Sequence, residues 1–416
     1  MGTLRSAVRA GRERFDPVLL VVCLAVAMTQ TAWAVVVPVL PAYVAEFGAG
    51  ATELGLIVAM FGIGRLVVNV PAGLLSQRVD PRLLLVGSVL GVVVLQAACA
   101  FAPNLGVLLV LRFVMGLSGG IAITCGMVLV SDLTTAANRG RAMATLQGVQ
   151  LVGGAIGPVI GGFTSAWWGN RAPFLVCGVL ALLVVVFGTR TLMRARLPGP
   201  EQAPRPATGG AARGPSAARS LLRDRSFLAV CGVGFSVFLH RFGGMQSLIP
   251  VVAYSVVGMS VAQFGVLLGA VTLGNLLTLP LAGHLNDRFG RKQVIVPGLL
   301  VVGAGVPLYA VTADPVWFIV ITVVTGLASG ICGPTPAAYV ADLVPAGGRG
   351  PAVGLYRTAG DLAGVVGPVA LGWLVDAGDH RAAVLALAAV VFGSGVVFAL
   401  AARETWHGTR KQAAEA

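Results

Sequence analysis

The sequence predicts an all-α integral membrane protein, with twelve transmembrane helices arranged as two pseudo-symmetric six-helix bundles. Of the 416 residues, 56% are hydrophobic and only 11% are charged, whereas soluble domains carry about 25% charged residues. Long uncharged runs alternate with brief polar turns, a pattern that does not fit the shorter, alternating strands of a β-barrel. An internal repeat indicates that the helices form two equivalent bundles.

Twelve apolar stretches reach the length of roughly 20 residues that a bilayer core of about 30 Å requires of a helix. Short breakers such as Asp314-Pro315 separate them and indicate helical hairpins. The stretches begin near Val18, Leu54, Leu83, Leu105, Ala142, Ala172, Phe227, Val261, Val294, Val316, Ala352 and Ala382.

The repeat has an offset of 210 residues and no gap. A register this strict across loops and apolar segments indicates two copies of one membrane unit, with the functional site expected between them. It places Gly73 on Gly283, Arg78 on Arg288, Gly116 on Gly326, Asp132 on Asp342, Arg139 on Arg349, and Gly157-Pro158 on Gly367-Pro368.

The repeat divides the chain into bundles over residues 18–195 and 226–402, with tails over 1–17 and 403–416. Residues 196–225 are rich in Pro, Gly, Ala and Arg and have too few apolar residues to form a core, so we expect a flexible cytoplasmic linker. The first span, with Ala32-Trp33-Ala34 near its end, mimics a signal peptide. Cleavage would break the repeat, so we expect an uncleaved span.

The basic residues predict the orientation in the membrane. With both termini in the cytoplasm, 23 of the 29 Lys and Arg lie inside, four lie within spans, and only Arg171 and Arg381 lie outside. This asymmetry is the positive-inside pattern of a multi-pass protein of the plasma or inner membrane. The net charge of +13 is therefore assigned to loops that face anionic lipid, and no nucleic-acid partner is expected.

Several function classes are disfavoured. The two lysines, Lys292 and Lys411, do not follow a glycine, so the chain lacks the phosphate-binding loop of an ATP-driven pump. The four histidines are scattered and the six cysteines all fall in predicted spans without a Cys-x-x-Cys pair, which indicates neither a metal site nor a disulfide framework. We expect a gradient-driven carrier without a cofactor or enzymatic activity, functioning as a monomer.

Two related polar motifs lie at equivalent positions of the repeat. The second runs from Gly283 to Lys292 and is predicted to form a tight cytoplasmic turn: its glycines permit close backbone approach, and a carboxylate favours a helix N-terminus. The first copy has Gln77 and Asp80 where the second has Asp287 and Gly290. The residues expected to act in these turns are Gly73, Arg78, Gly283, Asp287, Arg288, Gly290, Arg291 and Lys292, together with Asp132, Arg139, Asp342 and Arg349.

Spans 4, 5 and 11 carry glycine motifs. In span 4, Arg112 precedes Gly116 and Gly120 at four-residue spacing. An arginine at mid-membrane costs about 2.5–3.5 kcal/mol on insertion scales, so it requires a polar surrounding or a partner. In spans 5 and 11, proline kinks the helix while glycines allow close helix packing. The packing residues are Gly153, Gly157, Pro158, Gly161 and Gly162 in span 5, and Gly367 and Pro368 in span 11.

These motifs resemble the signature loop, arginine motif and antiporter motif of the major facilitator superfamily, and the twelve-span drug:proton antiporter branch in particular. The resemblance covers nearly the whole chain. It implies alternating access of two halves, loops that act as cytoplasmic latches, an arginine linked to proton coupling, and spans 3, 6, 9 and 12 in an outer lipid-facing layer. The departures at Gln77 and Asp80 imply a weakened first latch, unless Asp80 substitutes.

Polar residues within the spans predict a substrate site near mid-membrane. For Arg65, a bond to Asn69 is an alternative, and Arg357 and Asp361 are equally well interpreted as a structural ion pair. Packing roles for His240, Trp33 and Gln246 also remain open. The cavity residues are Gln30, Trp33, Arg65, Arg112, His240, Arg241, Gln246 and Asn275, and the candidates for proton coupling are Asp361, His240 and Arg112.

The predicted function is proton-coupled efflux of a small organic compound or drug. The predicted spans contain four arginines and one aspartate. This excess of positive charge favours a neutral or anionic substrate over a lipophilic cation. Two alternatives remain: an importer or facilitator of a small metabolite with the same fold, and a non-transporting membrane receptor or scaffold.

Overall fold

The computed structural model describes residues 17–134, 138–194, 221, 223–344 and 349–405. The tails and linker predicted from the sequence lie largely outside these ranges, so their boundaries stay predictions. In the described residues there is no strand, and twelve helices are long and apolar enough to cross a membrane. The number of spans and the helical class are confirmed.

The first bundle contains six spans. The spans are formed by α2 (Pro17–Ala34) with the short α3 (Leu40–Ala45), α4 (Ala51–Leu75), α5 (Pro81–Ala100), α6 (Leu105–Asp132), α7 (Arg139–Trp168) and α8 (Ala172–Arg194).

The second bundle repeats this order with more interruptions. Its spans are formed by α10 (Arg225–Phe238), the π-helix η1 (Leu239–Leu248) and α11 (Ile249–Ser255) together; α12 (Val261–Phe289); α13 (Arg291–Gly305) with the 3₁₀-helix η2 (Val306–Ala310); α14 (Pro315–Cys332) with α15 (Thr335–Leu343); α16 (Arg349–Ala377); and α17 (His380–Ala401).

Polar residues in the short connections start several of these helices. Asp80, Asn104 and Asp314 each accept a hydrogen bond from a backbone N–H in the first turn of the helix that follows. Such caps satisfy donors that have no partner within the helix. The polar breakers that separate the apolar stretches therefore also set where the spans begin.

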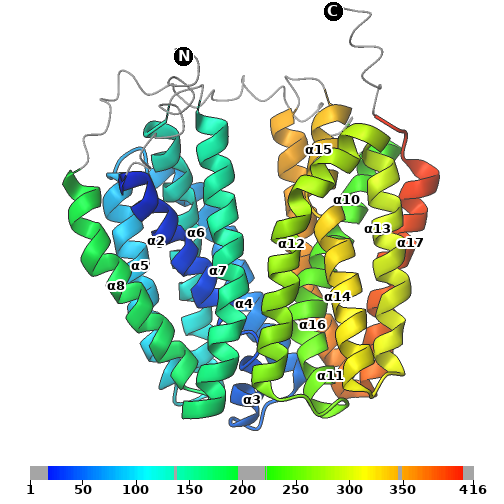
Figure 1. Ribbon diagram of the computed structural model, residues 1–416, viewed down its shortest axis with the longest axis horizontal. Helices are drawn as coiled ribbons and strands as arrows, with labels where there is room; N and C mark the ends of the chain where they lie inside the picture. The colour runs from blue at the N-terminus through cyan, green and yellow to red at the C-terminus, as the bar shows by residue number, and fades with distance from the viewer. Residues whose placement is uncertain (1–16, 135–137, 195–220, 222, 345–348, 406–416) are drawn as a thin grey trace, which may run out of the picture.

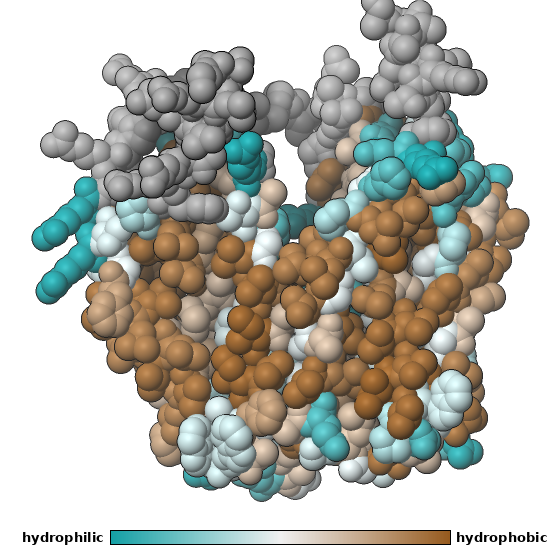
Figure 2. Space-filling view, viewed as in Figure 1, coloured by the Kyte–Doolittle hydropathy of each residue, from teal (hydrophilic) through white to brown (hydrophobic). Residues whose placement is uncertain are grey.

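The two bundles stand side by side and meet mainly through two helix pairs, α4 with α16 and α7 with α12, with a smaller contact between α4 and η1 (Figure 1). The bundles diverge at the end where α2 begins and α17 ends, called the basic end here. They converge at the end where α4 begins and α16 ends, called the closed end. Figure 2 shows an apolar belt between polar ends and a hollow between the bundles toward the basic end.

The glycine motifs form these contacts. A Cβ placed on Gly161 of α7 would lie 1.8 Å from the carbonyl oxygen of Val35, and one on Gly162 would lie 2.8 Å from that of Val261 in α12. One side of α7 therefore packs on its own bundle and another side on the second bundle. Only glycine permits this backbone approach. Gly153 and Gly157 also pack against the second half of α2, at Ala27 and Ala34.

The partial copy in span 11 is used in the same way. Gly367 of α16 packs on Leu239 within the second bundle, while Gly372 packs on Ala51 at the start of α4. The outer spans α5, α8, α13 and α17 make their principal contacts within their own bundle. The fold thus places two glycine-lined seams between the bundles and leaves a space between the seams.

Candidate functional site

A cavity of about 410 Å³ lies between the bundles. It is bounded by α2 and α7 of the first bundle and by α10, η1, α12 and α14 of the second. Among its lining residues there is no Asp or Glu. The structure brings together six of the eight residues that the sequence nominated for a substrate cavity, namely Gln30, Trp33, His240, Arg241, Gln246 and Asn275.

A smaller chamber of about 70 Å³ adjoins this cavity, because Trp33 and Phe238 line both. Arg65 of α4 and Asp361 of α16 line the chamber from opposite bundles. The Trp33 ring stacks on Phe61 with ring centroids 4.1 Å apart, so an aromatic pair separates the two spaces. Arg65 thus lies beside the main cavity.

The π-helix η1 carries His240, Arg241 and Gln246, and the sequence analysis did not anticipate it. At its end the Ile249 N–H donates to the carbonyl oxygen of Gly244, five residues back. The signal in the sequence is Gly243-Gly244 followed by Pro250, which has no N–H to continue an α-helical ladder. π-Helical turns are frequent at functional sites.

The side chains of His240 and Arg241, which both line the cavity, have different surroundings. The His240 side chain is buried, and its Nε2 atom has no hydrogen-bond partner among the described residues. The Arg241 guanidinium lies 5.7 Å from the ring centroid of Phe242, and no carboxylate within the described residues forms an ion pair with it. The wall formed by the second bundle therefore carries a positive charge that is open to the cavity.

Two charged residues line the chamber, Arg65 and Asp361, and Asp361 is close enough to Arg65 and Arg357 for their charges to interact. Arg65 is close enough to Arg241, Arg357 and Asp361 for their charges to interact. In the part of the chain that the structure describes, Arg357 and Asp361 form no ion pair, and Arg65 makes no hydrogen bond to Asn69. Neither structural alternative is realised in this conformation.

The structure corrects the position expected for Arg112. This side chain is 1% exposed and does not line the cavity. Its guanidinium lies 5.5 Å from the centroid of the Phe174 ring, and its Nη1 contacts the sulfur of Met115 at 3.8 Å. Arg112 therefore faces the core of the first bundle, and its role in proton coupling stays a prediction.

The predicted turn from Gly283 to Lys292 is mostly helical, which is a second correction. Helix α12 continues through Phe289, and only Gly290 leaves the helix, with φ +94°. A polar segment that extends beyond the bilayer keeps its helical hydrogen bonds, so polarity alone did not mark the helix end. The tight turn at Gly290 is present, but Gly283 has no neighbour in contact distance of an added Cβ.

Asp287, Arg291 and Lys292 of this segment make their polar contacts within the second bundle. The Arg291 guanidinium contacts Asp287 at 3.3 Å and Asp342 at 3.1 Å, and Lys292 Nζ donates to the carbonyl oxygen of Ala402 at 2.6 Å. Asp287 was expected at the N-terminus of a neighbouring helix. Its side chain is 81% exposed and contacts Arg291 instead, because the bundles are apart at this end.

The first copy of the motif serves its own bundle. Asp80 caps α5 and forms an ion pair with Arg82 at 2.6 Å, while Gly73 has open space around it. The hydrogen bonds from Arg82 hold the pKa of the Asp80 carboxyl below its usual value. Arg139 and Arg349 begin α7 and α16, but their side chains lie outside the described residues.

A twelve-helix membrane protein with a polar cavity between two related bundles is the architecture of a secondary transporter. The family model described as Major Facilitator Superfamily matches residues 22–260 and 241–416. The chain belongs to this family.

Curated relatives include transporters of several kinds. The chain is 26% identical to the "Multidrug resistance protein B homolog" of Mycobacterium tuberculosis over 74% of its length and 66% of that protein's. It is 27% identical to "Quinolone resistance protein NorA" of Staphylococcus aureus, over 36% and 39% of the two chains. It is 31% identical to the "Probable vesicular acetylcholine transporter-B" of Danio rerio, over 45% and 42%.

The fold also matches that of solved structures. A bacterial homologue of the human lysosomal transporter Spinster, described as inward-facing and occupied, has a TM-score of 0.75 at 16% identity, covering 92% of this chain and 96% of that one. At this identity the likeness shows the fold alone. The family match and the twelve spans among the described residues support a multi-pass membrane transporter.

Proposed function

We propose that the protein exports a small neutral or anionic organic compound or drug by alternating access, driven by proton entry. The observation that carries this proposal is the main cavity between the bundles. Its lining residues include the cation Arg241, which forms no ion pair with any described residue, and include no Asp or Glu. A lipophilic cation would enter this space beside a like charge, which is unfavourable at low dielectric.

The open basic end supports loading from the cytoplasm. In the orientation that the positive-inside pattern predicts, the basic end faces the cytoplasm, so this conformation faces inward. The names of the relatives from Mycobacterium tuberculosis and Staphylococcus aureus, which refer to drug resistance, support efflux as the direction of transport.

Proton coupling is assigned to the second bundle. Asp361 is the carboxylate that lines the chamber beside the cavity, and His240 is the imidazole that lines the cavity itself. Histidine titrates near neutral pH in water, and both groups lie on elements that contact the first bundle. A proton on either group would change the charge next to the substrate.

One observation favours proton-coupled import as a second candidate. Asp361 shares its surroundings with two arginines, Arg65 and Arg357, so a bound anion and the ionised carboxylate would compete for the same cations. Protonation of Asp361 would then favour anion binding, and the proton and the anion would cross in the same direction. A neutral substrate does not have this constraint.

The test is flux in proteoliposomes across a panel of cationic, neutral and anionic compounds, with and without an imposed pH gradient. Exchange of neutral or acidic compounds against protons supports the proposal. Co-transport of acids with protons supports the second candidate. Accumulation of ethidium-like cations only would overturn the substrate class.

A receptor or scaffold is tested separately. A disulfide engineered across the closed end would hold the bundles together there and prevent alternating access. Loss of transport in the oxidised protein, with recovery after reduction, is expected of a carrier. A scaffold would keep its function in both states.

A further inference from the structure

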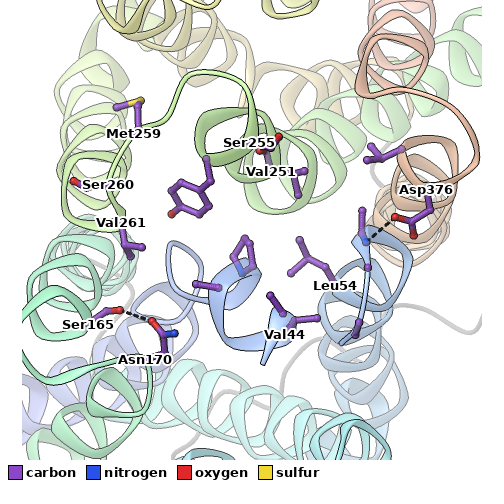
Figure 3. A pocket seen from close by; sticks show the side chains of 18 of the residues that line it. Val44, Leu54, Ser165, Asn170, Val251, Ser255, Met259, Ser260, Val261 and Asp376 are labelled. Atoms are coloured by element: carbon purple, nitrogen blue, oxygen red, sulfur yellow. Dashed lines mark hydrogen bonds between the residues drawn. The ribbon is translucent and has the colours of Figure 1, made fainter. Parts of the chain in front are cut away.

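The first turn of α4 is capped by a residue of the other bundle. The backbone N–H groups of Ala51 and Thr52 donate to Asp376 at 3.0 Å and 2.7 Å, and the Thr52 hydroxyl donates to the same carboxylate at 2.5 Å. Figure 3 shows Asp376 at the edge of a cavity of about 790 Å³ at the closed end. This contact, called the Asp376 cap here, joins the end of α16 to the start of α4.

Helix α4 needs this external cap because its own cap residue is glycine. Gly50 has no side chain to accept a hydrogen bond from the N–H groups of the first turn. Its backbone has φ −96°, which other residues adopt freely, so conformation does not require glycine. Space does, because a Cβ on Gly50 would lie 2.9 Å from the Asp376 carboxylate.

The equivalent helix of the second bundle is capped differently. At the 210-residue offset Gly50 corresponds to Ser260, whose hydroxyl accepts the Gln263 N–H at 3.2 Å, while the Gln263 side chain accepts the Ser260 N–H at 2.9 Å. Asp376 corresponds to Ala166, which has no polar group. Helix α12 therefore caps itself. In α4 the Glu53 side chain likewise accepts the Gly50 N–H, at 2.8 Å, but the N–H groups of Ala51 and Thr52 depend on Asp376 of the opposite bundle.

A second polar bond between the bundles lies at the same end. The Tyr254 hydroxyl donates to the carbonyl oxygen of Pro38, and the first-bundle counterpart of Tyr254 is Val44. In both cases the second bundle provides a polar side chain and the first bundle provides backbone groups, joined in the Asp376 cap by the Thr52 hydroxyl. The repeat therefore does not explain these bonds, which belong to the closed end of this protein.

We propose that Asp376 is the gating residue of the closed end, holding α4 against α16 and releasing it when this end opens. The proposal rests on the proposed transport by alternating access. Opening must separate α4 from α16, which removes a negatively charged cap from a helix N-terminus. The Asp376 cap therefore adds a free-energy difference between the two access states and favours the state open at the basic end.

The test measures the distance between the bundles at the closed end. Spin labels are placed at Trp168 and Trp317, which are 68% and 65% exposed and lie on α7 and α14, in a background whose six native cysteines are replaced by alanine. For Asp376→Ala we expect a longer-distance population, with the ratio of open to closed rising about fivefold, the usual effect of losing a cap. An unchanged distance distribution would overturn the proposal.

Two further variants separate gating from local helix stability. Asp379 lies at the same end but caps α17 of its own bundle, so Asp379→Ala should leave the distance unchanged. In Asp376→Ala with Gly50→Asn, α4 regains a cap within its own bundle. The longer population should persist in this double variant, and its disappearance would show that Asp376 acts only on local stability. These distances need no substrate, so they hold or fail independently of the transport assay.

Discussion

The two bundles have the same fold but different chemistry, and the 210-residue offset allows them to be compared position by position. Arg65 corresponds to Asn275, and Asp361 corresponds to Leu151. All four of these residues line the central cavity or its adjoining chamber. The repeat therefore conserves which positions face the space between the bundles, while the residue at each position decides what that space binds.

Packing positions, by contrast, are alike in the two bundles. Gly55 of α4 lies against the carbonyl oxygen of Pro368, and its counterpart Gly265 of α12 lies against that of Pro158, with 2.2 Å and 2.3 Å to an added Cβ. Both bundles keep glycines at the two seams because each bundle must approach the other equally closely there. Titratable groups are not shared, because Asp361 and His240 correspond to Leu151 and Gln30.

The largest expected effect tests the shared seams. Gly55→Leu and Gly265→Leu each place a side chain against backbone that has no room to move, and overpacking of this kind costs about 1–3 kcal/mol. We expect both variants to lose most transport and to lower the thermal midpoint of the purified protein by similar amounts. Gly87→Leu on α5, where an added Cβ meets no atom of the described residues within 4 Å, serves as the control. Unequal effects of Gly55→Leu and Gly265→Leu would contradict the equivalence of the two seams.

The next effect tests the assignment of proton coupling to the second bundle. In Asp361→Asn combined with His240→Ala we expect pH-driven exchange to be abolished, while counterflow without a pH gradient continues. The first-bundle counterparts, Leu151 and Gln30, do not titrate and have no equivalent to lose. Unchanged pH-driven exchange would mean that Asp132 or Asp342 carries the proton, or that transport does not depend on protons.

A smaller effect concerns the positive wall of the cavity. Arg241→Thr gives the second bundle the residue that Thr31 provides in the first. Hydrogen bonds to charged groups contribute about 1.5–3 kcal/mol, so the KM for an acidic substrate should rise roughly tenfold or more, while that for a neutral one changes little. Arg381→Thr, a surface change at the closed end, should alter neither. Equal losses for both substrates would mean that Arg241 supports structure rather than selectivity.

The sequence predicted features that depend on composition, and it missed those that depend on distant contacts. Span positions follow from apolar length, so the predicted starts lie within a few residues of the observed ones. The direction in which Arg112 points depends on how α6 is rotated against its neighbours, and hydropathy does not encode that rotation. The Asp376 cap joins residues more than 300 positions apart, and Gly50 was the only local sign that a cap was missing.

The smallest effect tests a position where the two copies of the polar motif differ. Asp80 caps α5, whereas its counterpart Gly290 makes a turn at positive φ. Removing a cap by Asp80→Ala costs about 1 kcal/mol. The pKa of Asp80 is lowered by its bonds to Arg82, so this stabilisation is present above the pKa of the unfolded chain and is lost as the pH falls through the lower folded value.

Thermal midpoints measured from neutral to acid pH check this sign. The wild-type protein and Asp80→Ala should differ at neutral pH and converge under acid conditions. Asp80→Asn keeps an oxygen that caps the helix but does not titrate, so the pH-dependent part of the difference should vanish in this variant. A gap between wild type and Asp80→Ala that widens on acidification would contradict the cap. It would place the effect of Asp80 in a contact that favours the protonated carboxyl.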